Sequence, residues 1–262
     1  MKLYSSSLIT AILIALELLD FEGSLAAEYA MRAQERLQDR YGIMVEQPAD
    51  SSNHAQLIEI IERGANWGNL NDRNTLVRFQ AENNITVDGI YGPVTERTLN
   101  DPDKIAIDRI PPELMSEDLF VALDTTRRIL TVYQRGEVLK KYPIAVGAGD
   151  LTPETKTEIA NRVVNPYWGG AGRYDPVPGG DPDNPLGTIW LGLRHGGGSQ
   201  YGIHGNAAPY SIGQSVSLGC VRMINEDVQE LYNTITIGTK VWIGSTSTLQ
   251  SWGIEKEIIY QH

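Results

Sequence analysis

The sequence predicts an α+β chain, in which a small N-terminal helical module precedes a mainly β domain of sandwich or barrel-like form. Two observations predict this division. Up to about residue 100, apolar residues recur with helical spacing, whereas from Leu119 onward short β-branched and aromatic runs alternate with glycine turns. The chain has 262 residues, 41% of them hydrophobic and 21% charged, which is enough for two modest domains with packed cores.

The N-terminal residues allow two interpretations. Residues 8–16 form a short apolar run, and residues 24–26 (Ser-Leu-Ala) resemble a small-residue cleavage site, so residues 1–26 are a candidate signal peptide. Acidic residues such as Glu17 follow the run closely and favour the alternative, an amphipathic first helix. The run is too short to span a bilayer, and no other segment is long and apolar enough, so no stable membrane span is expected.

Residues 28–100 are expected to form the helical module. The composition of residues 28–40 favours a helix, and apolar spacing favours another over residues 55–63, which Gly64 would end.

A weak internal repeat follows within this module. Residues 67–74 align with residues 91–98, and each unit contains an aromatic residue, a Gly, two spacers, a polar residue, an acid and an Arg. The polar residue is Asn71 in the first unit and Thr95 in the second. Each is expected to cap a helix, because side-chain oxygens there accept hydrogen bonds from the first free N–H groups and the next acid favours the positive helix end.

Residues 101–117 are predicted to be a semi-rigid linker, because prolines and charges flank this stretch. The β domain then occupies residues 118–244, and residues 245–262 form a C-terminal tail without an informative pattern. Within the β domain we expect strands or extended pieces at residues 121–124, 129–133, 138–146 and 161–168, and a strand at 240–243 that closes the sheet.

Two further segments of the β domain have a recognisable character. Residues 169–187 are rich in Gly, Pro and Asp, and the length of this loop favours a lid or substrate wall, with a functionless surface insertion as the alternative. Asn225 is expected to cap a helix over residues 225–232, directly after the cysteine motif described below.

Composition excludes some classes of function. The net charge of −11 argues against a nucleic-acid partner, since phosphate binding needs clustered Lys and Arg. One cysteine permits no intrachain disulfide, and the His and Cys spacings match no structural zinc framework, so neither metal nor cofactor is expected.

The single cysteine, Cys220, stands in the run Ser-Leu-Gly-Cys-Val-Arg-Met that begins at Ser217, and His204 precedes it within Ile-His-Gly. A lone Cys in an apolar run is usually a small buried hydrophobe. Here, however, an imidazole and a cation accompany the thiol, which is the usual means of making it a nucleophile. Gly219, immediately before the cysteine, predicts a tight turn that presents the sulfur and aims backbone N–H groups at a developing oxyanion.

These residues resemble the active-site signature of the L,D-transpeptidases with a YkuD-type catalytic domain: a His-Gly, a spacer of similar length, then Ser-x-Gly-Cys-x-Arg. The resemblance covers about residues 118 to 244. This chain departs from the usual pattern at Asn206, Thr155 and Leu218, and the last departure removes a second His and leaves the base role to His204. Residues 66–100 similarly resemble a peptidoglycan-binding-like helical module.

The resemblance implies a role for each motif residue. Cys220 is the nucleophile, and His204 accepts and later returns its proton. The backbone N–H groups of Gly219 and Cys220 are candidates for the oxyanion hole, the backbone at Gly205 approaches the substrate, and Ser217 braces the turn. Arg222 would hold a substrate carboxylate, with an ion pair to Glu226 or Asp227 as the alternative. His195 is expected only in the pocket wall.

The implied function is a peptidoglycan L,D-transpeptidase that crosslinks stem peptides. Cys220 would attack the L,D bond of a tetrapeptide stem, D-Ala would leave, and the amine of a second stem would attack the thioester. Glycan strands would contact the helical module, and the protein would act outside the cytoplasm, in the periplasm or cell wall. The alternatives are hydrolysis of the same thioester (an L,D-carboxypeptidase), a non-catalytic wall-binding protein, and a metal site of His195, His204 and Cys220.

Overall fold

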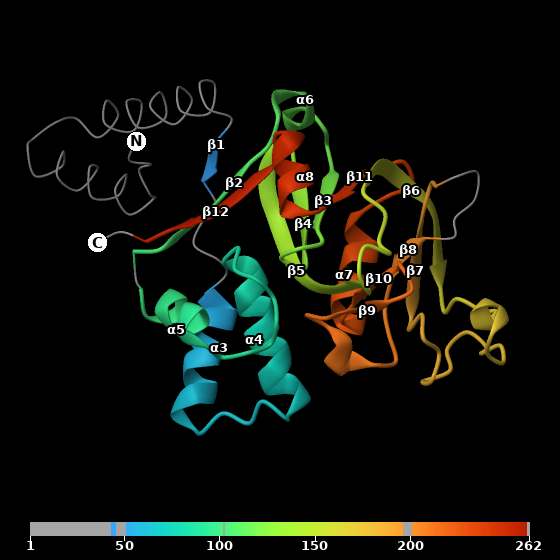
Figure 1. The fold of residues 1–262 in the computed structure, drawn as a ribbon, viewed down its shortest axis with the longest axis horizontal. Coiled ribbons are helices and arrows are strands. Elements are labelled where there is room, and N and C mark those ends of the chain that lie inside the picture. The colour runs from blue at the N-terminus through green and yellow to red at the C-terminus, as the bar shows by residue number, and fades with distance from the viewer. Residues whose placement is uncertain (1–42, 46–50, 102, 196–200, 261–262) are drawn as a thin grey trace, which may run out of the picture.

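The computed structural model describes residues 43–45, 51–101, 103–195 and 201–260. The candidate signal peptide 1–26 and the helix expected over residues 28–40 lie outside these ranges. In Figure 1 the helical module, coloured blue to green, lies against one side of a barrel-like sheet, as the predicted fold class requires.

The helical module consists of α3 (Ser51–Glu62), α4 (Leu70–Glu82) and α5 (Pro93–Asn100). The helix predicted over residues 55–63 is therefore confirmed as part of α3, and Gly64 follows it with a φ of +88°, a conformation that glycine adopts without strain. The three helices enclose a small core of their own, made of Leu57, Leu76, Phe79 and Leu99.

Both predicted helix caps of the module are wrong by a few residues. The N-cap of α4 is Asn69, whose side chain accepts hydrogen bonds from the backbone N–H groups of Asn71 and Asp72. Helix α5 begins at Pro93, and Thr95 lies inside it, buried, where Gln80 Nε2 donates to its Oγ1 at 3.2 Å. Proline at the first helical position replaces the side-chain cap, because its fixed φ already suits a helix.

A three-stranded sheet joins the two ends of the described chain. Strand β2 (Ile105–Arg109) pairs antiparallel with β1 (Ile43–Val45) on one side and with β12 (Glu255–Ile259) on the other. The segment expected to be a linker thus contains a strand, and the segment expected to be a patternless tail contains another, after the short helix α8 (Thr246–Ser251). Because β2 and β12 are far apart in the sequence, the local residue pattern of each segment does not predict that the two will pair as strands.

Nine strands form the main sheet. In chain order they are β3 (Phe120–Asp124), β4 (Ile129–Gln134), β5 (Glu137–Gly147), β6 (Thr155–Val164), β7 (Ile189–Leu193), β8 (Gly202–His204), β9 (Ser215–Ser217), β10 (Val221–Met223) and β11 (Lys240–Gly244). Their spatial order is β10-β8-β7-β6-β11-β3-β4-β5-β9. An additional pairing of β10 with β5 closes the barrel, whereas β11, expected to close it, lies between β6 and β3.

Helix α7 (Asn225–Thr234) packs on this barrel through Val228 and Leu231, which belong to the main hydrophobic core with the inward side chains of the strands. Helix α6 (Pro112–Met115) contributes Leu114 to a smaller core with β3 and β11. No helix within the described ranges is long and apolar enough to cross a membrane.

The helical module and the barrel share one hydrophobic cluster. It combines Val77, Ala81 and Val87 of the module with Ile129, Ala145, Ile212 and Ile224 of the barrel domain, all buried. The buried Arg73 guanidinium donates to the Ile212 carbonyl at 2.7 Å, and the Val87 N–H donates to the Arg127 carbonyl at 2.9 Å. The module is therefore fixed to the barrel by apolar burial and by hydrogen bonds that cross the contact.

A fully buried charge cluster ties the three-stranded sheet to the barrel. Asp108 of β2 contacts Lys141 of β5 at 2.9 Å and Lys256 of β12, and Tyr133 of β4 donates to it at 2.5 Å. Burial alone would raise the pKa of Asp108, but the two ammonium groups hold it well below its ordinary value. Because buried charges are tolerated only when paired, this cluster fixes the relative position of β2, β12 and the barrel.

Candidate active site

The strand period brings the predicted catalytic residues to one face of the barrel wall. Strands β8 and β10 pair in parallel, with Arg222 opposite His204. Ile203, Val221 and Met223 point into the main core. Because successive side chains point to opposite faces of a strand, His204 and Arg222 point outward, and Cys220, two residues before Arg222, lies on the same side.

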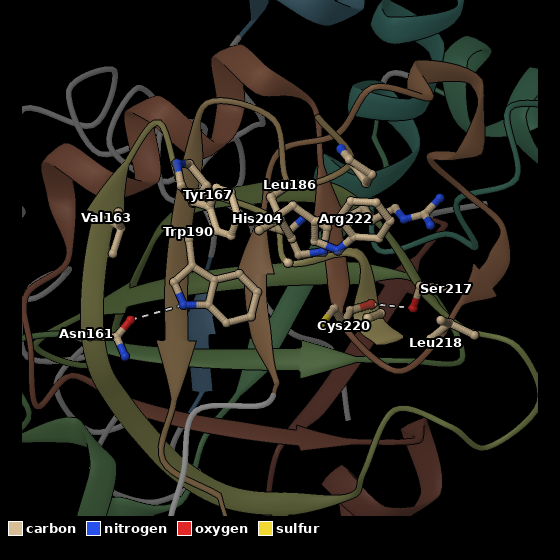
Figure 2. Close-up of a pocket in the computed structure, with 15 residues that line it drawn as sticks. Asn161, Val163, Tyr167, Leu186, Trp190, His204, Ser217, Leu218, Cys220 and Arg222 are labelled. Atoms are coloured by element: carbon tan, nitrogen blue, oxygen red, sulfur yellow. Dashed lines mark hydrogen bonds between the residues drawn. The ribbon is translucent and has the colours of Figure 1, made fainter. Parts of the chain in front are cut away.

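These three side chains line one pocket with a volume of about 810 Å³, and Figure 2 shows them together in it. Its floor is the outer face of β6, β7, β8 and β10. One wall is the loop rich in Gly and Pro that was predicted as a lid or substrate wall, and the other is the turn before Cys220. The lining residues are Asn161, Val163, Pro166, Tyr167, Trp168, Gly169, Ala171, Pro185, Leu186, Trp190, His204, Ser217, Leu218, Cys220 and Arg222.

The imidazole of His204 is oriented by the carbonyl of the next residue. His204 is 4% exposed, and its Nδ1 lies 2.6 Å from the Gly205 carbonyl oxygen. A carbonyl only accepts, so Nδ1 carries the proton and Nε2 is left with a lone pair. Gly205 was expected beside the substrate, but its carbonyl instead supplies the orienting group that the sequence did not identify.

Burial keeps this imidazole neutral. Desolvation lowers the pKa of His204 to about 4, the Gly205 hydrogen bond acts to raise it, and the positive charge of Arg222 lowers it further. Trp190 contributes to the burial, since its ring stacks on the imidazole with centroids 5.8 Å apart and an interplanar angle of 22°. Asn161 Oδ1 in turn accepts from the Trp190 indole at 3.1 Å, as Figure 2 shows.

Two asparagines hold the loop after His204. The Asn206 N–H donates to Asn225 Oδ1, and Asn225 Nδ2 donates back to the Asn206 carbonyl, both at 3.0 Å. Asn225 was expected to cap α7, but the N-cap is Ile224 and no side chain caps the helix. A Cβ added at Gly205 would lie 2.1 Å from Asn225 Oδ1, so this packing requires glycine there.

The turn before Cys220 is braced from both ends. Ser217 Oγ donates to the Cys220 carbonyl at 2.5 Å and accepts from the Gly219 N–H at 3.1 Å. Gly219 has a φ of +122°, which other residues rarely adopt, and Thr152 Oγ1 donates to its carbonyl at 3.0 Å. The Gly219 N–H, one of the two expected oxyanion donors, is thus engaged by Ser217.

The thiol differs from expectation in its protonation. Burial raises the pKa of Cys220, and the backbone of Gly202 and the charge of Arg222 only partly oppose this. The sequence suggested a thiol with a lowered pKa, because an imidazole and a cation stand near it. Desolvation outweighs both in the folded chain, so the resting pair is a neutral thiol beside a neutral imidazole.

Arg222 makes no ion pair with any residue in the described ranges. The alternative partner Asp227 is instead held by Arg78 of α4, at 2.6 Å. The half-buried Arg222 guanidinium therefore lines the pocket as a positive charge not neutralised by Glu226 or Asp227.

His195 lies outside the pocket lining, and its ring meets the Tyr201 ring edge-on at 5.1 Å. Among the residues that the structure describes, no three His, Cys, Asp or Glu side chains are grouped so as to hold a metal ion.

Sequence reasoning missed three residues of the site: Trp190, Asn161 and Thr152. Trp190 carried a signal, since it alternates with Ile189 and Leu191, which point into the core. The roles of Asn161 and Thr152 depend on contacts between distant segments and have no local signal.

The chain resembles known proteins over the barrel domain. A family model for the YkuD L,D-transpeptidase catalytic domain matches residues 118–243. YqjB of Bacillus subtilis, named among the L,D-transpeptidases, is 40% identical over 129 residues, which cover 48% of this chain and 71% of that protein. YkuD of Bacillus licheniformis is 40% identical over 124 residues, covering 47% of this chain and 64% of that one. A crystal structure of an L,D-transpeptidase from Xylanimonas cellulosilytica has 17% identity and a TM-score of 0.49, with 76% and 96% of the two chains covered.

Proposed function

Since this chain belongs to the L,D-transpeptidase family with a YkuD-type catalytic domain, we propose that it crosslinks peptidoglycan stem peptides through a thioester on Cys220. The observation that carries the proposal is the convergence of Cys220, His204 and Arg222 in one open pocket. A nucleophile, a base with an oriented lone pair and an uncommitted cation are the groups that acyl transfer to and from a peptide carboxylate requires.

The first step is attack on the donor stem. His204 Nε2 accepts the thiol proton as Cys220 Sγ bonds to the carbonyl carbon of the L,D bond. That bond's C–N link then breaks, and the imidazolium returns the proton to the departing D-Ala nitrogen. Because both groups are neutral at rest, the proton moves during the attack rather than before it, which is general-base catalysis.

The second step regenerates the thiol. The amine of an acceptor stem bonds to the thioester carbon, the C–S bond breaks, and His204 passes the amine proton to the sulfur. For both steps we assign the oxyanion to the Cys220 N–H, since the Gly219 N–H is engaged by Ser217 Oγ. One such donor contributes about 3–4 kcal/mol to the transition state.

Arg222 is assigned to the D-Ala carboxylate. Its guanidinium lines the pocket, and Asp227, which would otherwise neutralise it, pairs with Arg78. An unneutralised guanidinium can bind a carboxylate with two hydrogen bonds, so it would favour stems that end in a free D-Ala.

The helical module is assigned to the glycan strand. A second cavity of about 610 Å³ lies between α3, α4 and the loop after His204. Six of its lining residues carry amide or hydroxyl groups, namely Gln56, Asn71, Asn74, Thr75, Asn206 and Asn225, and the others are Leu70, Arg78, Pro182, Ala207, Pro209, Ile224 and Glu226. Asn74 Oδ1 is buried without a hydrogen-bond partner among the described residues. Such a lining suits an uncharged, multiply hydrogen-bonding ligand such as an N-acetylated saccharide.

This glycan assignment is tested by titrating the protein with a stem-free N-acetylated disaccharide, followed by calorimetry. Asn74→Leu should abolish the binding, whereas Asn100→Leu, on an exposed position of α5, should not. Equal binding by the two variants removes the cavity from the proposal.

The location of the protein and the roles of its two domains follow from the proposed function. A peptidoglycan substrate places the protein outside the cytoplasm, in the periplasm or cell wall, and the signal peptide over residues 1–26 remains a prediction. We retain residues 28–100 as the wall-binding module and residues 118–244 as the catalytic domain.

One experiment tests the catalytic proposal. Wild type and Cys220→Ala are incubated with a disaccharide-tetrapeptide, and mass spectrometry follows the protein and the products. An acyl adduct on Cys220, free D-Ala and crosslinked dimer support the transpeptidase. Free D-Ala with tripeptide and no dimer makes the protein an L,D-carboxypeptidase. Identical spectra from both proteins, with a substrate that an active relative consumes, leave a non-catalytic wall-binding protein.

A further inference from the structure

One face of helix α4 lies against the segment that follows the cysteine motif. Arg73, Val77, Arg78 and Ala81 recur at helical spacing, and each is directed at the barrel domain. Val77 and Ala81 share a buried cluster with Ile224, the N-cap of α7. The module therefore contacts the beginning of α7 rather than a part of the barrel surface remote from the site.

Arg78 adds a directed polar contact to this packing. Its Nη2 donates to Asp227 Oδ1 at 2.6 Å, and its Nε lies 3.1 and 3.3 Å from the two carboxylate oxygens. Asp227 is buried and stands in the first turn of α7. A forked guanidinium–carboxylate pair fixes orientation as well as distance, so Arg78 holds the first turn of α7 in place.

That first turn begins with Asn225, which is bonded at two points to the main chain of Asn206. Asn206 directly follows Gly205, whose carbonyl orients the His204 imidazole at 2.6 Å. Asn206 Nδ2 also donates to the Met223 carbonyl at 2.7 Å, which ties the same loop to β10. A continuous set of hydrogen bonds and one helical turn therefore connects the module to the imidazole.

We propose that Arg78 is a positioning residue for His204, and that the helical module is thereby a working part of the catalytic site. Arg78 touches no reacting atom. It acts by fixing Asp227 and the start of α7, so that Asn225 holds the Gly205 carbonyl where it selects the imidazole tautomer and ring orientation. The inference rests on the proposed function for its substrate readout, but the orientation itself can be measured without substrate.

The substrate-free measurement is the alkylation rate of Cys220 by iodoacetamide across a pH series. Below the thiol pKa the reaction depends on His204 as proton acceptor, and above it the thiolate needs no help. In Arg78→Ala we expect the rate below the thiol pKa to fall by about tenfold toward that of His204→Gln, with the rate above it unchanged, because small misplacements of a base are costly. Arg78→Lys keeps the positive charge but loses the two-point contact of the guanidinium with the carboxylate. Its alkylation rate below the thiol pKa should lie between those of wild type and Arg78→Ala.

The matched control is Arg63→Ala. Arg63 also pairs with an aspartate, Asp72, but entirely within the module, so its loss should leave the pH series unchanged. The chain of contacts is tested by a double-mutant cycle: Arg78→Ala combined with Asn225→Ala should be no slower than Asn225→Ala alone, since both act through the same carbonyl. With a tetrapeptide donor that carries no saccharide, and so does not enter the cavity that Arg78 lines, Arg78→Ala should lower kcat for acylation and leave KM unchanged.

Two results overturn the inference. One is an Arg78→Ala profile that coincides with that of Arg63→Ala. The other is a double variant whose loss equals the product of the single losses. If Arg78→Ala does not fold, Arg78→Lys and Asp227→Asn carry the same comparison. Absence of any acyl adduct in wild type contradicts the proposed function alone, because the alkylation series still tests the positioning role.

Discussion

The Nδ1 atom of His204 lies 2.6 Å from the carbonyl oxygen of Gly205, the residue that follows it in the chain. A backbone carbonyl cannot change its protonation state, unlike the carboxylate that orients histidine in many hydrolases. The imidazole therefore keeps one tautomer without a buried negative charge beside it. This arrangement also keeps the imidazole neutral, since no carboxylate among the described residues offsets the desolvation that lowers its pKa to about 4.

The neutral, buried His204 should make stability depend on pH. Its pKa is about 4 in the folded chain, below its ordinary value of 6.5, so its contribution is present above pH 6.5 and is lost as pH falls toward 4. Urea unfolding should show wild type losing about 2–3 kcal/mol more than His204→Gln between pH 7.5 and 4.5. Equal losses in the two proteins would show that the histidine is solvated.

The Cys220 thiol should ionise at a higher pH than an ordinary cysteine. Because burial raises the pKa of Cys220, the iodoacetamide rate should keep rising through the range in which an ordinary cysteine has levelled off. The same protein unfolded in urea supplies the reference curve. A rate that levels off at the same pH as in the unfolded protein would contradict this prediction, because it would show that the thiol pKa is not raised by folding.

Gly219→Ala should disable the site. The added Cβ would lie 2.6 Å from Tyr201 Cε1 and 2.8 Å from the Leu151 carbonyl oxygen, at a φ of +122°. The turn must shift, and we expect the acylation rate to fall by about 100-fold. Gly238→Ala is the control, since its φ is +88° but nothing lies within 4 Å of its added Cβ. Similar rates for the two variants would mean that the turn tolerates displacement.

Asp108→Asn should destabilise the whole chain. It leaves Lys141 and Lys256, 3% and 2% exposed, without their shared carboxylate. Removing one partner of a buried ion pair costs about 3–5 kcal/mol, measurable by chemical denaturation. Glu117→Gln, which breaks the surface pair with Lys240, should cost less than about 1 kcal/mol. A small loss for Asp108→Asn would indicate that one lysine is already neutral.

The grouping of Cys220, His204 and Arg222 in one pocket could be predicted from the sequence. A short motif identifies the three residues, and the two-residue period of a strand directs their side chains to one face. Cys220 and Arg222 alternate with buried Val221 and Met223, as His204 does with Ile203. The protonation of the thiol could not be predicted in the same way. Its direction depends on how deeply the fold buries the sulfur, which neighbours in sequence do not determine.

The segments that were mispredicted share a physical cause. Strand β2 is only five residues long, Ile-Ala-Ile-Asp-Arg, without a regular alternation of apolar and polar residues, and its partner β12 lies far along the chain, so nothing local distinguished a strand from a linker. Likewise Asn69 and Asn71 are equally suited to cap a helix by residue type, and only the extended backbone at Asn69, with φ −79° and ψ 130°, makes it the cap.

The buried contact of Lys256 with Asp108 spans 148 residues of sequence, which has a consequence for how the protein is made. During synthesis Asp108 emerges from the ribosome long before this lysine does. Until strand β12 is available, the carboxylate has one ammonium partner fewer and β2 has an unpaired edge. The nascent chain therefore completes its native structure only when residues near 256 have been translated, and it remains incompletely folded up to that point.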